Sequence, residues 1–166
     1  MSAKPETERK FLIEKPSEAV LLALSGAVAD DIVQTYLLAP RGVTARVRRR
    51  AGVGGVTYTH TEKRRLTAMT AMEDEREIGE SEYRALLGRA DPALRPIEKR
   101  RISVPHGALL LEIDLYPFWQ RQAVLEVELP SEDTPLRLPP YLHMIREVTG
   151  DRRYKNVSLA REIPEE

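Results

Sequence analysis

Charged residues recur at every second position in short segments that favour extended structure. Eight such segments follow one another along the chain: 6–14, 31–39, 44–50, 56–64, 70–78, 97–104, 108–116 and 123–129. Successive side chains of a strand point to opposite faces, so each period-two pair lies on one wall of a sheet. The charged groups are Glu6, Glu8 and Lys10, then Arg46 and Arg48, Thr61 and Lys63, Glu75 and Glu77, Lys99 and Arg101, Glu112 and Asp114, and Glu126 and Glu128. The pattern predicts a mainly β chain of the α+β class with antiparallel strands.

The positions between these charged residues, which point to the opposite face, are apolar in the later segments, as in Leu111, Ile113 and Leu115. A face of this kind requires a core, so the charged residues lie on the other face. Mixed charges are normal on the solvated face of an open sheet, but here acidic and basic pairs segregate by strand. Closing the sheet into a barrel would gather them around one lumen, where carboxylates bind divalent cations and Arg and Lys bind phosphate oxygens. This sorting favours a site for a metal polyphosphate complex.

Helical signals are fewer. The clearest helix is expected after Ser17, a suitable N-cap, and ends by Gly26. A second is predicted over 79–90 and a shorter third over 140–149. The charged tail is expected to be ordered only in part beyond Leu159.

The composition bounds the function. With 166 residues, the chain has room for a single domain over 1–166. Lys+Arg 26 and Asp+Glu 26 balance to a net charge of +0, so nucleic acid and anionic membranes are not expected partners. Cysteine is absent, which excludes disulfides, thiolate metal sites and cysteine nucleophiles. The start lacks an apolar leader and the apolar run 19–24 is too short to span a bilayer, so we expect a cytoplasmic protein.

Several motifs stand in an order that resembles one known family. Glu6-Thr7-Glu8-Arg9-Lys10 matches the E-x-E-x-K signature of the CYTH family, the triphosphate tunnel metalloenzymes. The charged pairs described above follow in the order of the family, and Asp151-Arg152-Arg153-Tyr154-Lys155-Asn156 matches its C-terminal basic motif. The resemblance covers nearly the whole chain, and it is closest to the compact bacterial inorganic triphosphatases.

The resemblance implies an antiparallel, eight-stranded tunnel-like β-barrel with helices packed outside. It implies Mg²⁺ or Mn²⁺ held by carboxylates, for which the candidates are Glu6, Glu8, Glu128, Glu126, Glu112 and Asp114. It implies phosphate-binding cations at Lys10, Arg46, Arg48, Lys63, Lys99, Arg101, Arg153 and Lys155. The candidate catalytic residues are Glu75, Glu77 and Glu126, which could activate a water, together with Lys63 and Tyr36.

One position departs from the family pattern. Many members carry an arginine two positions before the central Glu-x-Glu, where this chain has Glu73. The phosphate contact of that strand is therefore left open. The three histidines, His60, His106 and His143, occupy a strand, a turn and a short helix in this prediction and are not expected to converge.

These features predict a divalent-metal-dependent phosphohydrolase that removes the terminal phosphate of inorganic triphosphate. Two activities of the same family stay open, a class IV adenylate cyclase and a thiamine triphosphatase. Both would need a surface for a base or thiazole at the tunnel mouth. A polyphosphate-binding module without turnover is a third alternative, although it leaves the acidic pairs unexplained. A homodimer is also left open, and Trp119 is expected to be a loop aromatic that either caps the barrel or forms a subunit contact.

Overall fold

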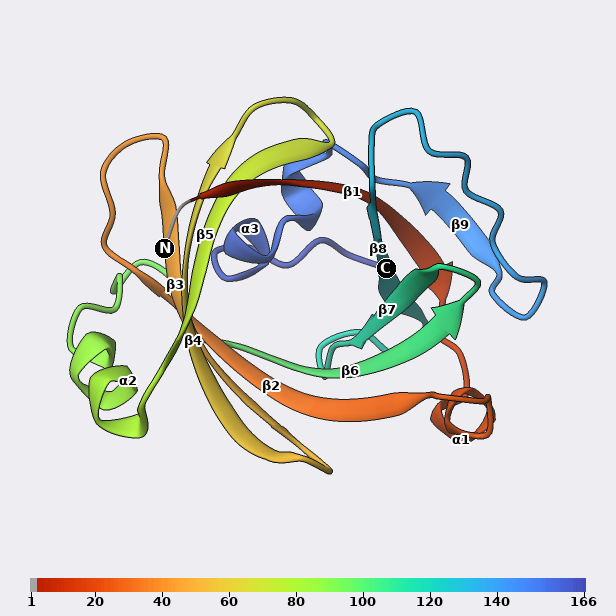
Figure 1. Ribbon diagram of the computed structural model, residues 1–166, viewed down its shortest axis with the longest axis horizontal. Coiled ribbons are helices and arrows are strands. Elements are labelled where there is room, and N and C mark those ends of the chain that lie inside the picture. The colour runs from red at the N-terminus through yellow and green to blue at the C-terminus, as the bar shows by residue number, and fades with distance from the viewer. Residues whose placement is uncertain (1–2) are drawn as a thin grey trace.

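Eight antiparallel strands close into a barrel in the computed structural model, which describes residues 3–166 (Figure 1). Around the ring the strands pair in the order β1, β5, β4, β3, β2, β6, β7, β8 and back to β1. Their bounds are β1 Lys4–Glu14, β2 Val28–Leu37, β3 Thr44–Gly52, β4 Gly55–Arg65, β5 Thr70–Ile78, β6 Ile97–His106, β7 Leu109–Leu115 and β8 Gln122–Leu129. The predicted strands and barrel are confirmed.

Strand β1 closes the barrel and also carries an extra strand. Its first part, Lys4 to Thr7, pairs with β5, and its opposite edge pairs with β8 from Thr7 to Glu14. The edge beyond Thr7 pairs in part with a ninth strand, β9 Met144–Glu147. The helix predicted over 140–149 is therefore wrong. A free edge of β1 offers backbone hydrogen bonds that outweigh a weak local helix preference.

The helices α1 and α2 lie outside the barrel (Figure 1). Helix α1 Glu18–Leu22 is capped by the Ser17 hydroxyl, which accepts from the Val20 amide, and it is shorter than predicted. Helix α2 Glu80–Leu87 covers β2, β3 and β4, where Tyr83 packs on Tyr58 with ring centroids 4.8 Å apart. Among residues 3–166, no helix is long and apolar enough to cross a membrane.

Apolar residues cover the outside of the wall and fill one end of the interior. The outward-facing Ile113 and Leu125 belong to a core that includes Leu21 of α1, and α2 covers a smaller cluster on the other side. The third cluster contains Tyr116, Trp119, Tyr154 and Leu159, and it closes one end of the barrel. Because the apolar parity faces outward, the charged parity faces the lumen.

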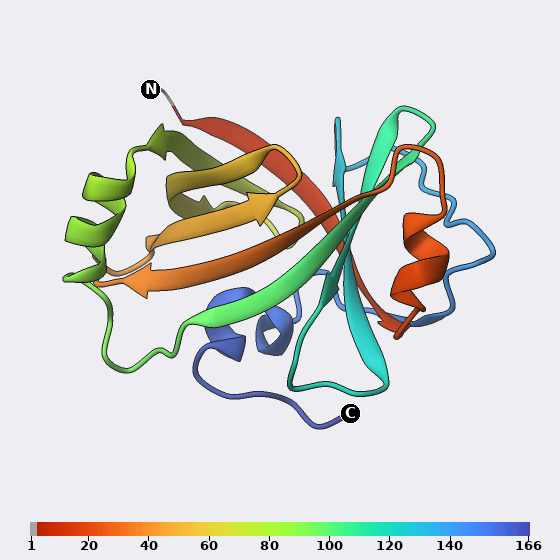
Figure 2. The same cartoon turned by 90° about the horizontal axis from the view of Figure 1, so that it is seen from below.

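The segment after β9 forms the floor of the lumen. It contains the 3-10 helix η1 Arg152–Tyr154 and the short helix α3 Asn156–Leu159, which lies at one end of the barrel (Figure 2). The tail beyond it is packed against the barrel, contrary to the expectation of partial order. Ala160 is buried, the Trp119 indole donates to the Pro164 carbonyl at 3.0 Å, and the backbone N–H of Gln122 donates to the Glu166 carboxylate at 3.0 Å. Apolar contacts with Trp119 hold this charged segment in place.

Candidate active site

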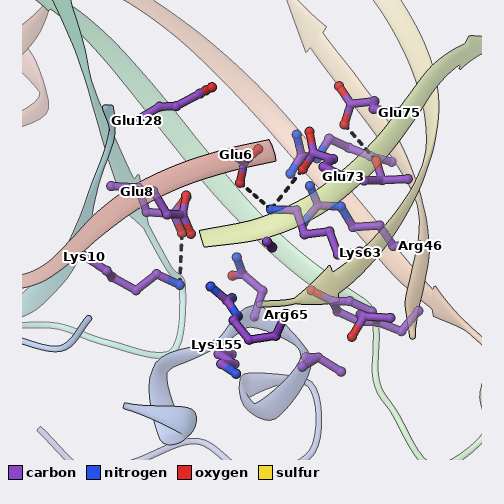
Figure 3. Close-up of a pocket in the computed structure, with 18 of the residues that line it drawn as sticks. Glu6, Glu8, Lys10, Arg46, Lys63, Arg65, Glu73, Glu75, Glu128 and Lys155 are labelled. Carbon is purple, nitrogen blue, oxygen red and sulfur yellow. Dashed lines mark hydrogen bonds and ion pairs between the residues drawn. The ribbon is translucent and has the colours of Figure 1, made fainter. Parts of the chain in front are cut away.

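A cavity of about 480 Å³ occupies the lumen above the α3 floor. Its volume lies in the range of small-molecule sites, roughly 300–1,000 Å³. Charged side chains from β1, β3, β4, β5, β6, β7 and β8 line it, and Lys155, Asn156 and Val157 form the floor (Figure 3). The interior is therefore a polar chamber suited to a compact, highly charged ligand.

Two arginines of β3 point into this cavity without an acidic partner. Within the described part of the chain, Arg46 forms no ion pair, and its buried Nε has no hydrogen-bond acceptor. Arg48 donates one hydrogen bond to the Gln34 side chain at 3.3 Å, and its Nε is likewise unpartnered. Burial and the nearby Arg46 lower the pKa of Arg48 to about 10. Two half-buried guanidinium groups that form no ion pair, each with a buried and unpartnered Nε, favour binding of an anion.

Further cations gather where the floor meets the wall. Lys155 lies near Arg65, as the close-up of the cavity shows (Figure 3). Burial and the positive charge of Arg65 lower the pKa of Lys155. The third cation of this group is Lys10 on β1. Its Nζ donates to the Tyr154 carbonyl at 3.2 Å and forms an ion pair with Glu126 at 3.3 Å. Together these cations form a second anion-binding region of the same cavity.

Lys63 of β4 lines the cavity and pairs with two carboxylates. Its Nζ lies 2.6 Å from Glu6 Oε1 and 3.0 Å from Glu73 Oε2 (Figure 3). Burial alone would lower the pKa of Lys63, as would Arg46, but the carboxylates of Glu6 and Glu8 raise it overall. Lys63 therefore stays protonated while much of its charge is neutralised.

Glu8 and Glu128 are the acidic counterpart of the free arginines. They are paired positions of β1 and β8, and both line the cavity. Neither carboxylate forms an ion pair or hydrogen bond with residues 3–166. Burial and the neighbouring Glu126 raise the pKa of Glu8. Carboxylate oxygens without cationic partners are the donors that Mg²⁺ and Mn²⁺ prefer, so the residues fit a hard divalent cation.

This fit does not amount to a finished metal site. Among the described residues, no group of three or more His, Asp or Glu side chains converges to hold a metal ion. Glu6 is engaged by Lys63 and Glu126 by Lys10 and Arg101. A bound cation would therefore complete its coordination with substrate oxygens and water, which is the usual way in which proteins bind Mg²⁺.

A network of ion pairs fixes the wall formed by β6, β7 and β8. Arg101 donates to Asp114 at 2.7 and 2.9 Å, to Glu112 at 2.6 Å and to Glu126 at 3.2 Å. Behind it, Lys99 Nζ lies 2.7 Å from Asp114 Oδ2, and both side chains have no exposed surface. Burial would raise the pKa values of Asp114 and Glu126, but the surrounding cations lower both.

Most of the residues predicted from the sequence meet in the cavity. Lining it are Glu6, Glu8, Lys10, Tyr36, Arg46, Arg48, Lys63, Glu75, Arg101, Glu112, Glu126, Glu128 and Lys155. Four do not line it. Lys99 and Asp114 are sealed behind Arg101, Glu77 is exposed on β5, and Arg153 lies outside, where Asp151 binds it at 2.7 Å. Lys99 and Asp114 point toward the interior as predicted, but both lie too deep to reach a ligand.

Sequence reasoning missed several cavity residues. Lys4, Arg50 and Arg65 line the cavity, and Glu73 does so in the place where many relatives carry arginine. Each has the parity of a named pair on its own strand, so extending the alternation by one step would have found it. The pairing of Glu73 with Lys63 could not be read from the sequence, because it joins neighbouring strands.

Comparison with known proteins agrees with this geometry. No established family profile matches the chain. Over 162 residues the chain is 32% identical to the inorganic triphosphatase of Nitrosomonas europaea, a match that covers 96% of this chain and 99% of that protein. The crystal structure of an inorganic triphosphatase superimposes with a TM-score of 0.58 at 30% identity, over 96% of this chain and 97% of the other. A conserved hypothetical protein from Pyrococcus furiosus shares the fold, with a TM-score of 0.57 at 20% identity, over 77% of this chain and 80% of the other.

The closed barrel and its charged lumen define a polyanion-binding tunnel protein. The full-length similarity makes the assignment specific: the chain belongs to the CYTH family of triphosphate tunnel enzymes, in which it is similar to the inorganic triphosphatases. The resemblance seen in the sequence motifs is thus confirmed.

Proposed function

We propose that the protein hydrolyses inorganic triphosphate to pyrophosphate and phosphate in the lumen, with Mg²⁺ or Mn²⁺ as cofactor. One observation carries the proposal: a single cavity holds two arginines, Arg46 and Arg48, and two carboxylates, Glu8 and Glu128, none of which forms an ion pair with residues 3–166. A metal triphosphate satisfies both sets at once, whereas a simple anion or cation satisfies only one. The similarity to an inorganic triphosphatase supports the same substrate.

In this proposal the cationic side chains of the cavity bind phosphate oxygens and the carboxylates bind the metal ion. Arg46, Arg48, Lys10 and Lys155 would bind phosphate oxygens, with Lys63 between them and the carboxylates. Glu8 and Glu128, with Glu6 nearby, would hold the cation, which neutralises phosphate charge when bound. Arg101 would fix Glu112 and Glu126 in place, because its guanidinium is already occupied by carboxylates.

Glu75 is the best-placed group to orient the attacking water. It lines the cavity, and the Thr61 hydroxyl donates to its Oε2 at 2.7 Å, which fixes the carboxylate. In the proposed step the water oxygen attacks the terminal phosphorus in line, the bond to the bridging oxygen breaks, and Glu75 takes the water proton. Pyrophosphate leaves with its charge balanced by the arginines. Glu126 is less suited as a base, because Lys10 and Arg101 lower its pKa against the effect of burial.

Competition kinetics would test the substrate. We expect a higher kcat/KM for inorganic triphosphate than for ATP or thiamine triphosphate, and slow turnover of pyrophosphate, which cannot reach both anion-binding regions. A kcat/KM for ATP at or above that for triphosphate, or cyclic AMP as the main product, would favour the cyclase. Tight triphosphate binding without phosphate release would favour a binding module. The cytoplasmic location and the homodimer stay predictions.

A further inference from the structure

Gln34 is a buried amide at the side of the cavity that the mechanism above does not use. Its side chain on β2 has no exposed surface, and it forms hydrogen bonds with two cavity residues. Arg48 Nη2 donates to Gln34 Oε1 at 3.3 Å, and Gln34 Nε2 lies 2.9 Å from the Tyr36 hydroxyl. Such a residue costs desolvation free energy unless its hydrogen bonds are kept, so its position is well defined.

Donor and acceptor chemistry fixes the direction of this chain of hydrogen bonds. Arginine has only donors, so the Gln34 atom that faces Arg48 must be the carbonyl oxygen. The amide nitrogen then faces Tyr36, and because it can only donate, the Tyr36 oxygen accepts. The hydroxyl hydrogen of Tyr36 must therefore point elsewhere. Among residues 3–166 no acceptor receives it, and Tyr36 lines the cavity.

We infer that Gln34 is a positioning residue that turns the Tyr36 hydroxyl into a hydrogen-bond donor toward a phosphate oxygen of the substrate. The inference rests on the proposed function and deepens it. It assigns to Tyr36 the role of a neutral donor, because the hydroxyl oxygen accepts from the amide and the hydroxyl hydrogen is left to donate. The positive charge of Arg48 polarises this series of hydrogen bonds at one end. At the other end, the substrate anion accepts the hydrogen bond from the Tyr36 hydroxyl.

A double-mutant cycle on the full chain tests this coupling. Tyr36→Phe removes only the hydroxyl and should lower kcat/KM for triphosphate about tenfold or more, the size expected for one hydrogen bond to a charged group. Gln34→Met keeps the side-chain volume but frees the hydroxyl to rotate, and it should produce most of the same loss. The double variant should be little worse than either single variant, because both remove one interaction.

Gln122→Met is the matched control. Gln122 is also a buried amide, and it lies in β8 outside the cavity lining. We expect its loss to alter the melting temperature without lowering kcat/KM. Losses that multiply in the double variant, or a Gln34→Met enzyme with wild-type kcat/KM, would overturn the inference. An equal loss in Gln122→Met would also overturn it, because it would indicate a general effect of removing buried amides.

Binding measurements keep the test independent of turnover. Calorimetric titration with inorganic triphosphate should show weaker binding in Tyr36→Phe and Gln34→Met, again without a further loss in the double variant. If the wild-type protein does not turn over triphosphate, the proposed function fails, yet the binding cycle still decides the role of Gln34. Additive losses of affinity would refute it. If Gln34→Met does not fold, Gln34→Leu serves in the same cycle.

Discussion

Glu8 and Glu128 occupy paired positions of β1 and β8, both line the cavity, and neither forms an ion pair with residues 3–166. Burial and the neighbouring Glu126 raise the pKa of Glu8, and a bound divalent cation would offset both effects. The pair therefore connects the fold to the proposed metal site, because only the closure of the barrel brings the acidic residues of β1 beside those of β8.

Glu8→Gln should keep the fold, since it preserves volume and removes only the charge. We expect turnover of triphosphate to fall at least about a hundredfold, in line with the loss of one element of a preorganised electrostatic site. Steady-state kinetics with Mg²⁺ and Mn²⁺ would measure it, with the exposed Glu62→Gln on β4 as control. Wild-type rates in Glu8→Gln, or full activity in excess EDTA, would refute the proposed metal site.

Arg46→Ala and Arg49→Ala separate the two faces of β3. Arg46 lines the cavity and Arg49 does not, although both are arginines of the same strand. Removing the inward charge should raise KM for triphosphate about tenfold or more, and removing the outward charge should change it little. Equal effects of the two substitutions would mean that the assigned register is wrong, because a slip of one residue exchanges the faces.

Glu73→Gln should tighten substrate binding. Glu73 neutralises part of the Lys63 charge at 3.0 Å, and its removal leaves Lys63 with Glu6 as its remaining carboxylate partner. We expect KM for triphosphate to fall a few-fold. Asp74→Asn is the control, since it lies next in sequence but outside the cavity lining. A higher KM in Glu73→Gln would show that Glu73 helps to hold the substrate, for example through the metal.

Asp114 should matter for stability more than for contact with substrate. Asp114→Asn removes the charge that binds both Lys99 and Arg101, and breaking such a buried pair costs about 3–5 kcal/mol. Lys99→Met should cost much less, because Asp114 keeps its two hydrogen bonds to Arg101. Chemical denaturation would compare the free energies of unfolding. Equal stability of Asp114→Asn and wild type would contradict the structural role.

Lys99 should also give the stability a pH dependence. Burial lowers its pKa from 10.5 to about 7, against the opposing effect of Asp114. Between these two values the unfolded chain holds the proton more often than the folded one, so the contribution of Lys99 to the free energy of unfolding rises with pH. Denaturation at about pH 7 and at about pH 9.5 should show a larger gain for the wild type than for Lys99→Met. Parallel pH curves for the two proteins would rule this out.

The sequence by itself determined the strands, the barrel's two faces and most of the cavity lining. Side-chain direction alternates along a strand for local reasons, so the spacing of Arg46 and Arg48 was enough to place both inward. The helix after Ser17 is also local, because a hydroxyl at the N-cap satisfies a free amide. These features need no knowledge of which strands become neighbours.

The tertiary structure alone decided which charges are free. Lys99, Arg101 and Arg46 follow the same alternating pattern in the sequence. In the structure, Asp114 of the neighbouring strand pairs with Lys99 and Arg101, whereas Arg46 forms no ion pair with residues 3–166 and is left for a ligand. The same holds for β9, which exists because β1 leaves an edge open, and for the α3 floor, which apolar contacts hold in the barrel. Coulomb interactions and burial depend on distances between segments far apart in the chain, and local sequence patterns do not contain those distances.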